Sequence, residues 1–186
     1  MEAFLASIGL VALAEVGDKT QLLSLALAAK YRRPLPIIAG IAIATLFNHA
    51  LAGALGAWIA QVIGPRALQI GLGLSFLAMA AWMLVPDKLD LAARPARFGV
   101  LITTIIAFFL VEMGDKTQVA TVALAARYAD FAAVVAGTTL GMLLANAPLV
   151  AFGDRLLARV PVRVVQRAAS LLFALFGVLA ILRAWR

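Results

Sequence analysis

The heptapeptide Glu-x-Gly-Asp-Lys-Thr-Gln occurs twice in this chain, and each copy lies inside a long apolar run. The first copy covers residues 15–21 and the second covers residues 112–118, which is 97 residues later in a chain of 186. Each copy places two carboxylates and an ammonium group where a membrane-spanning segment would have its middle. Charges at that depth are costly and are usually functional. The duplication therefore predicts two related halves that share one site.

The apolar runs predict an all-α membrane protein that crosses the bilayer several times. The chain is 65% hydrophobic, with a mean hydropathy of +1.04, whereas soluble domains are about 45–50% apolar. Runs of about 20 apolar residues suit helices that cross a hydrocarbon core of roughly 30 Å. The runs are continuous rather than alternating, so we do not expect a β-barrel. The six predicted spans cover residues 3–29, 35–60, 67–86, 98–126, 131–152 and 165–184.

The positive charges predict how these spans are oriented. Most of the net charge of +7 lies in short connections between the runs, which argues against a nucleic-acid-binding face. The first, third and fifth connections hold three, three and four Lys or Arg residues, whereas the other connections and both termini hold four together. The positive-inside rule then places the odd connections in the cytoplasm and both termini outside. The chain begins Met1-Glu2 without a basic segment, so we expect a first span rather than a signal peptide.

The predicted topology makes the duplication an inverted repeat. Residues 1–86 form one three-helix repeat, residues 87–97 a cytoplasmic linker, and residues 98–186 the second repeat. An odd number of spans in each half makes the second half enter the membrane from the opposite side. Transporters built this way bind their substrate near the midplane, at the interface between the repeats.

The motif supplies oxygen ligands with helical spacing. On a regular helix the carboxylates and the amide of each copy lie on one arc. Lys19 follows Glu15 at the spacing of a helical Glu–Lys pair. Gly17 and Gly114 let a neighbouring helix approach, or let the helix unwind. The predicted metal ligands are Glu15, Asp18, Gln21, Glu112, Asp115 and Gln118.

The summed charge and the ligand types indicate a hard divalent cation. Four carboxylates and two ammonium groups carry a formal charge of −2, which one divalent ion neutralises. Carboxylate and amide oxygens suit Ca²⁺, Mn²⁺ or Mg²⁺. Zinc and copper are not favoured, since the chain has no Cys and one His. The metal is expected as a transported substrate, with no resident cofactor.

Other polar residues near the motifs have a supporting role in this prediction. His49 either completes the cation shell, relays protons or bonds a neighbouring helix, and Asn146 occupies the matching place 97 residues later. Ser24 and Thr121 are expected to bond within their own helices. The two motif threonines bond the backbone or, in an opened helix, act as ligands. The supporting set is Lys19, Thr20, Lys116, Thr117, Asn48, His49 and Asn146.

A purely structural role for these charges is the simplest alternative. Intramembrane ion pairs can hold helices together, and a single Glu–Lys pair would favour that interpretation. Six ionisable groups at roughly 2.5–3.5 kcal/mol each cost some 15–20 kcal/mol on the insertion scale. Helix association does not require such a cost, so transport is the better hypothesis.

The two motif copies in a six-span chain resemble those of the Golgi-type calcium/manganese–proton antiporters and their bacterial manganese-exporter relatives. The family signature is Glu-x-Gly-Asp-Lys/Arg-Thr/Ser, once per half, and residues 15–20 and 112–117 both match it in full. The resemblance implies export of Mn²⁺ or Ca²⁺ in exchange for protons across the inner membrane of a bacterial cell. It also implies that Glu15, Asp18, Glu112 and Asp115 bind the cation.

The resemblance leads to a mechanistic hypothesis that leaves alternatives open. Protons on Glu15 and Glu112 give way to a cation, which protons from outside later displace, while the motif lysines keep the aspartates ionised. A cation channel without proton coupling, or an exporter of a small organic ion, would also use intramembrane charges. An enzyme is not expected, because no Ser/His or HExxH constellation accompanies the carboxylates. Both Mn²⁺ and Ca²⁺ remain candidates for the transported ion, and both a monomer and a homodimer remain candidates for the oligomeric state.

Overall fold

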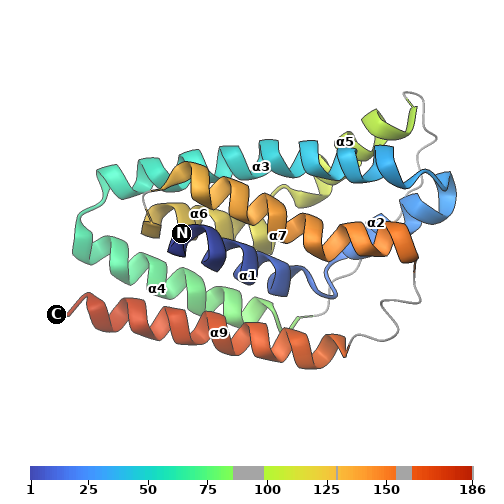
Figure 1. The fold of residues 1–186 in the computed structure, drawn as a ribbon. Helices are drawn as coiled ribbons and strands as arrows, with labels where there is room; N and C mark the ends of the chain where they lie inside the picture. The colour runs from blue at the N-terminus through green and yellow to red at the C-terminus, as the bar shows by residue number, and fades with distance from the viewer. Residues whose placement is uncertain (86–98, 129, 154–160, 186) are drawn as a thin grey trace.

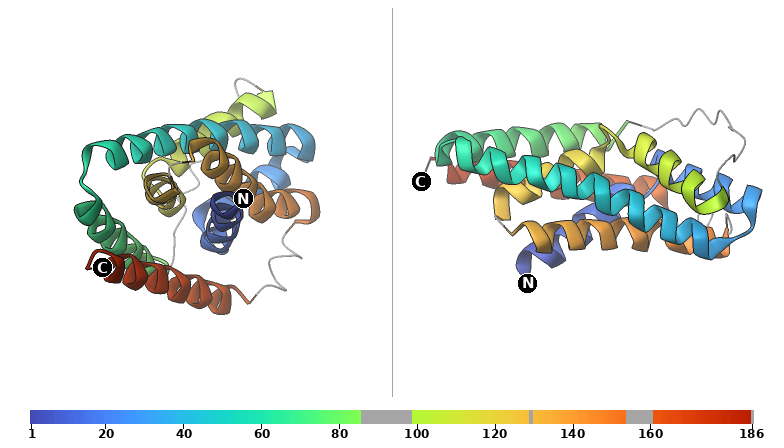
Figure 2. Two further views of the ribbon diagram at one scale, coloured as in Figure 1. Left: turned by 60° about the vertical axis from the view of Figure 1, so that its left-hand side comes forward. Right: turned by 90° about the horizontal axis from the view of Figure 1, so that it is seen from above.

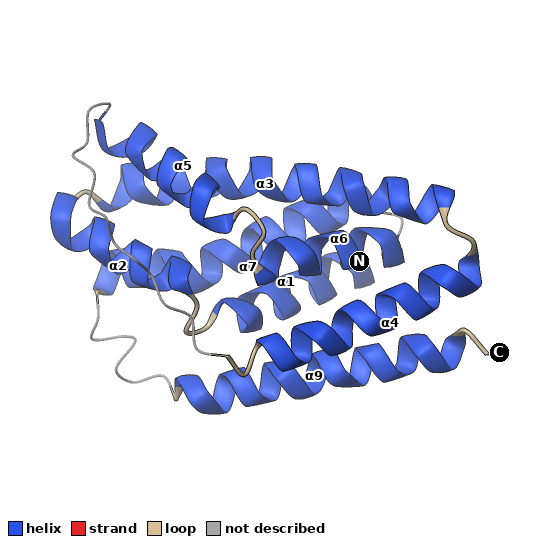
Figure 3. Cartoon of the chain, turned by 180° about the vertical axis from the view of Figure 1, so that it is seen from behind, coloured by secondary structure: helices blue, strands red, loops and turns tan. Residues whose placement is uncertain are grey.

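The computed structural model describes residues 1–85, 99–128, 130–153 and 161–185, and in this part of the chain it is helical without strands (Figures 1 and 3). The predicted linker at residues 87–97 lies outside the described residues, as do Arg155 and Arg159 of the fifth connection. The helices are α1 (Glu2–Glu15), α2 (Lys19–Tyr31), α3 (Pro34–Val62), α4 (Pro65–Trp82), α5 (Gly99–Glu112), α6 (Lys116–Tyr128), α7 (Phe131–Phe152) and α9 (Val162–Arg183).

The first and fourth predicted spans are each divided into two half-helices. The chain leaves the helix after Glu15 and again after Glu112, and a new helix begins at Lys19 and at Lys116. Each half-helix has 13 or 14 residues, a length of roughly 20 Å at 1.5 Å per residue. The prediction that each motif lies on one arc of a regular helix is therefore wrong. The alternative prediction, that the helix unwinds at the motif glycine, is the one that the structure shows.

Several helices have the character of membrane spans. Three of them, α3, α7 and α9, are long and apolar enough to cross a bilayer, and α5 is a shorter apolar helix. Large apolar side chains remain exposed on α3 and α9, among them Phe47, Leu51 and Leu171. Exposed apolar surface of this extent suits contact with lipid. The chain is thus an all-helical membrane protein, while its six-span inverted topology and orientation stay predictions.

Of the broken helices, α1 and α6 lie between the long helices α3 and α7 on one side and the α4–α9 pair on the other (Figures 1 and 2). Helix α3 packs along α5, α6 and α7, and α7 packs along α1 and α2. Glycines allow close approach: a Cβ on Gly40 would lie 2.7 Å from the Cβ of Thr104, and a Cβ on Gly137 would lie 2.8 Å from that of Ser7. The long helices therefore pack closely against the motif-bearing half-helices.

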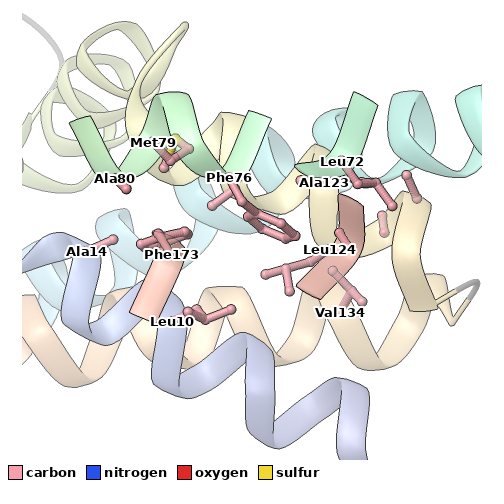
Figure 4. Close-up of a cluster of buried hydrophobic side chains, with 14 of the residues drawn as sticks. Leu10, Ala14, Leu72, Phe76, Met79, Ala80, Ala123, Leu124, Val134 and Phe173 are labelled. Carbon is pink, nitrogen blue, oxygen red and sulfur yellow. The ribbon is translucent and has the colours of Figure 1, made fainter. Parts of the chain in front are cut away.

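Helices α4 and α9 form a pair on the other side of α1 and α6. Phe76 of α4 and Phe173 of α9 contact each other with ring centroids 6.1 Å apart. Figure 4 shows these two rings beside Leu10 and Ala14 of α1 and Leu124 of α6. Burial of these aromatic side chains fixes the α4–α9 pair against the broken helices.

Candidate functional site

Glycine and glutamine together build the break in each motif. Gly17 and Gly114 adopt positive φ values of 79° and 74°, which favour a residue without a Cβ. The freed amide of Gly17 donates to Gln21 Oε1 at 2.8 Å, and that of Gly114 donates to Gln118 Oε1 at 2.6 Å. The two glutamines were predicted as metal ligands, but here their oxygens close the unwound turns.

The aspartates begin the second half-helices without capping them by their side chains. Asp18 is the N-cap residue of α2, yet its carboxylate accepts no hydrogen bond from the backbone of that helix. The backbone amides of Asp18 and Asp115 instead donate to the carbonyls of Glu15 and Glu112, at 3.0 and 3.1 Å. Neither of these bonds involves an aspartate carboxylate, and both carboxylates face lysines of the other motif copy.

The lysines and aspartates pair across the two halves. Lys19 Nζ lies 3.3 Å from Asp115 Oδ1, and Lys116 Nζ lies 3.4 Å from Asp18 Oδ1. The helical pairing of Lys19 with Glu15 suggested by their spacing is thus wrong, because the break at Gly17 removes the regular helix that it requires. The pairing brings both motif copies into one charged cluster.

The two ion pairs differ in exposure. The Lys116 side chain is 2% exposed and the Lys19 side chain is 24% exposed, while both aspartates are buried at 1%. One pair is therefore sealed within the protein, and the other retains access to its surface.

Glu15 is held by a polar chain that reaches α7. Asn146 Nδ2 donates to Glu15 Oε1 at 3.0 Å, and Ser24 Oγ donates to Asn146 Oδ1 at 2.7 Å. The prediction that Ser24 bonds within its own helix is wrong, since its hydroxyl reaches across to α7. Its place 122 residues before Asn146 in the chain gave no signal of this contact.

Glu112 is held differently although it occupies the equivalent position. Thr117 Oγ1 donates to Glu112 Oε1. His49 is fully buried, and within the described residues neither of its ring nitrogens has a hydrogen-bond partner. Asn48 Nδ2 donates to the carbonyl of Phe109 on α5 at 3.1 Å. Asn146 therefore binds a motif glutamate, whereas no such bond links His49 to Glu112.

The motif threonines are both buried, but only one of them is bonded. Thr20 Oγ1 has no hydrogen-bond partner among the described residues. Thr121 Oγ1 donates to the Thr117 carbonyl at 2.8 Å, which confirms its predicted bond within its own helix. The second half-helix of each motif is thus lined by small polar groups next to the carboxylates.

The four carboxylates lie near enough to act on one another, but they do not form a ready-made metal cluster. The charges of Glu112, Asp18 and Asp115 all act on the Glu15 carboxyl group. Glu15 Oε2 and Glu112 Oε2 are buried, and no described group bonds to them. Nevertheless, no three His, Asp or Glu side chains in the described part of the chain are grouped closely enough to hold a metal ion. The cluster offers unused oxygens, but they are not gathered around one point.

Replacement of the two break glycines by alanine is expected to have unequal effects. A Cβ costs roughly 1–2 kcal/mol in a left-handed conformation, and this strain applies at both sites. At Gly17 the Cβ would also overlap Val162 and lie 2.8 Å from Gln166 Nε2, whereas at Gly114 no described residue beyond its chain neighbours comes within 4 Å. Gly17→Ala should therefore lower the melting temperature in detergent more than Gly114→Ala. Equal shifts would contradict the packing described at Gly17.

The chain matches a known family over almost its whole length. The model of the family described as divalent cation/proton antiporter GDT1 matches residues 3–91 and 100–186. A Vibrio cholerae protein named "Putative manganese exporter" is 50% identical over 178 residues, which cover 95% of this chain and 89% of that protein.

More distant relatives extend this similarity to other organisms. The yeast divalent cation/proton antiporter GDT1 is 23% identical, with 100% of this chain and 85% of the yeast protein covered. A GDT1-like protein of Synechocystis is 26% identical, with 97% of each chain covered. No solved structure matches the chain. The family is one of transporters rather than enzymes, and this chain belongs to it: it is a member of the GDT1 family of divalent cation/proton antiporters.

Proposed function

We propose that this protein exports Mn²⁺, Ca²⁺ or both from the cytoplasm in exchange for protons. The observation that carries the proposal is the pair of crossed Lys–Asp contacts, which joins both motif copies into one buried cluster of opposite charges. The relatives named for manganese export and for divalent cation/proton antiport support the choice of substrate. The protein would act in the inner membrane as a six-span carrier, with both termini outside.

Repeat-related contacts support an inverted repeat made of residues 1–86 and 98–186. The two halves are offset by 97 residues. When each residue of the Lys19–Asp115 pair is replaced by its equivalent in the other half, the result is Lys116 and Asp18, which form the other ion pair. The same exchange relates the close approach of Gly40 to Thr104 to that of Gly137 to Ser7. Contacts that exchange in this way are expected of two halves related by a two-fold axis, and an odd number of spans in each half would place that axis in the membrane plane.

The broken helices support a cation site at the interface of the two halves. Half-helix ends leave backbone carbonyls without helical partners, and in transporters such carbonyls bind cations beside the carboxylates. Glu15, Asp18, Glu112 and Asp115 would supply the carboxylate oxygens. Because two of these residues face lysines, the ion must displace the ammonium groups when it binds. Gln21 and Gln118 would join the shell only after releasing the turn amides.

The glutamates are the proposed carriers of the exchanged protons. Each keeps one buried oxygen without a described partner, and each lies beside other carboxylates. Like charges close together in an apolar interior are relieved either by a proton or by a divalent cation. Binding of one would thus expel the other, which is the coupling that an antiporter requires.

Transport by the purified protein tests the proposal directly. In liposomes with an imposed pH gradient, the protein is expected to accumulate Mn²⁺ against its own gradient, and a protonophore should stop the accumulation. Liposomes without protein give the background, and Ca²⁺ in place of Mn²⁺ measures the preference. Cation flux that only dissipates gradients and ignores the protonophore would indicate a channel, and absence of flux for both ions would refute the proposal.

A further inference from the structure

The first motif break is covered by the start of α9. Val162 and Gln166 lie one turn apart on this helix, and both face Gly17. A Cβ on Gly17 would lie 2.8 Å from Gln166 Nε2 and would overlap the Val162 side chain. The unwound turn therefore has an apolar group and an amide directly over its backbone.

The second motif break has no such cover in the described part of the chain. Gly114 is exposed, and no described residue beyond its chain neighbours lies within 4 Å of the position of a Cβ. Subtracting 97 from Gln166 gives Gln69 on α4, and subtracting 97 from Val162 gives Pro65 at the start of α4. Gln69 Oε1 is instead buried without a described hydrogen-bond partner. The sequence thus contains two equivalent covers, of which one is in place among the described residues.

Helices α4 and α9 are joined by an interface that is itself symmetric under this exchange. Phe76 and Phe173 are 97 residues apart and contact each other. A Cβ on Gly73 would lie 2.8 Å from the Gly177 carbonyl oxygen, and the exchanged contact is Ser170 Oγ donating to the Ala80 carbonyl at 2.7 Å. A symmetric interface of this kind can persist unchanged while the pair moves as one body.

The α4–α9 pair is placed asymmetrically on the broken helices. Helix α4 packs against α6 and α9 packs against α1, whereas the contacts of this pair with α2 and α5 are sparse. Figure 1 shows both helices alongside α1, with α2 beyond their ends. In the predicted orientation, α1 and α6 are the outer halves of the broken helices, so the pair covers the outer side of the cluster.

We infer that Val162 with Gln166, and Pro65 with Gln69, are two alternating gates carried by the moving α4–α9 pair. In the described state Gln166 covers the first break, the outer half-helices are covered, and the cluster is accessible from the cytoplasm past Gly114. In the opposite state the pair packs on α2 and α5, Gln69 covers Gly114, and Gln166 leaves Gly17. This inference rests on the proposed function, because it assigns the moving parts of alternating access.

Paired cysteines can report each gate, since the chain has no cysteine of its own. The closed gate is probed by Val16→Cys with Val162→Cys, and the open gate by the repeat-related Met113→Cys with Pro65→Cys. With a short, cleavable bifunctional thiol reagent, metal-free protein should link the first pair readily and the second slowly. During turnover with Mn²⁺ and a pH gradient, the second link should increase severalfold. Either link should stop uptake, and cleavage should restore it.

The matched glutamine variants give a second, independent measurement. Gln166→Ala should reduce the first link and raise the second, while Gln69→Ala should do the reverse. Shifts of both variants in the same direction would contradict the gates, as would a second pair that never links in a protein that transports. The proposed function is tested separately by Mn²⁺ uptake of the cysteine variants before they are linked. Linking of the metal-free protein can be measured in detergent, where no transport takes place.

Discussion

Glu15→Gln combined with Glu112→Gln is expected to abolish proton-coupled Mn²⁺ uptake while leaving the protein folded. The substitution removes both groups that would exchange a proton for the cation, but it retains side chains of the same size that still accept hydrogen bonds. Asn146 and Thr117 would keep their bonds to Oε1, so the polar chain to α7 should survive. Uptake in liposomes with an imposed pH gradient should fall to the level of protein-free liposomes.

A matched control for this loss lies on the protein surface. Glu2 is exposed at the start of α1, where it accepts a hydrogen bond from Tyr128. Glu2→Gln makes the same chemical change outside the cluster and should leave uptake near that of the unmodified protein. Size-exclusion elution and melting temperature in detergent establish folding. Substantial Mn²⁺ accumulation by a folded double variant would refute the role of the two glutamates.

Asp18→Asn is expected to destabilise the protein considerably more than Asp115→Asn. The first change removes the carboxylate that faces Lys116, whose side chain is 2% exposed. The second removes the carboxylate that faces Lys19, whose side chain is 24% exposed. Loss of one partner from a buried pair costs about 3–5 kcal/mol, because the remaining charge stays buried without its counter-charge. The partly exposed Lys19 can turn toward the surface when Asp115 is neutralised, so the cost there should be smaller. The melting temperatures of the two variants in detergent measure the difference.

Neutralising the facing lysine provides the control for this comparison. Lys116→Gln added to Asp18→Asn removes the buried ammonium group as well, so it should recover part of the lost stability. A double variant as unstable as the sum of its single variants would show that Asp18 and Lys116 do not act together. Equal losses in Asp18→Asn and Asp115→Asn would contradict the unequal burial of the pairs.

The long helices were predictable because their signal is continuous. The apolar runs from residue 35 and from residue 131 correspond to α3 (Pro34–Val62) and α7 (Phe131–Phe152), with Pro34 at the start of one and Asp130 capping the other. Side chains along such a run all favour a helix, and proline or a capping residue marks where the helix starts. Burial of the motif carboxylates also followed from their place within apolar sequence.

The internal geometry of the site was not predictable from helical spacing. A single glycine with positive φ turns the chain out of the helix, so the angular relation of Glu15 to Lys19 is lost. Which lysine meets which aspartate then depends on how the halves pack, and no local pattern encodes that. The recurrence of Gln69 as Gln166 was visible in the sequence, but its significance required the position of α9 over Gly17.

The crossed ion pairs make each half of the chain the source of its partner's counter-charge. Residues 1–86 contain Lys19 and Asp18, but the groups that these two face at 3.3 and 3.4 Å belong to the other half. A half produced alone would lose both cross-half pairs and present its charges to lipid. Loss or divergence of one copy of the motif would therefore leave the charges of the other copy without counter-charges. The two copies are for this reason constrained to change together.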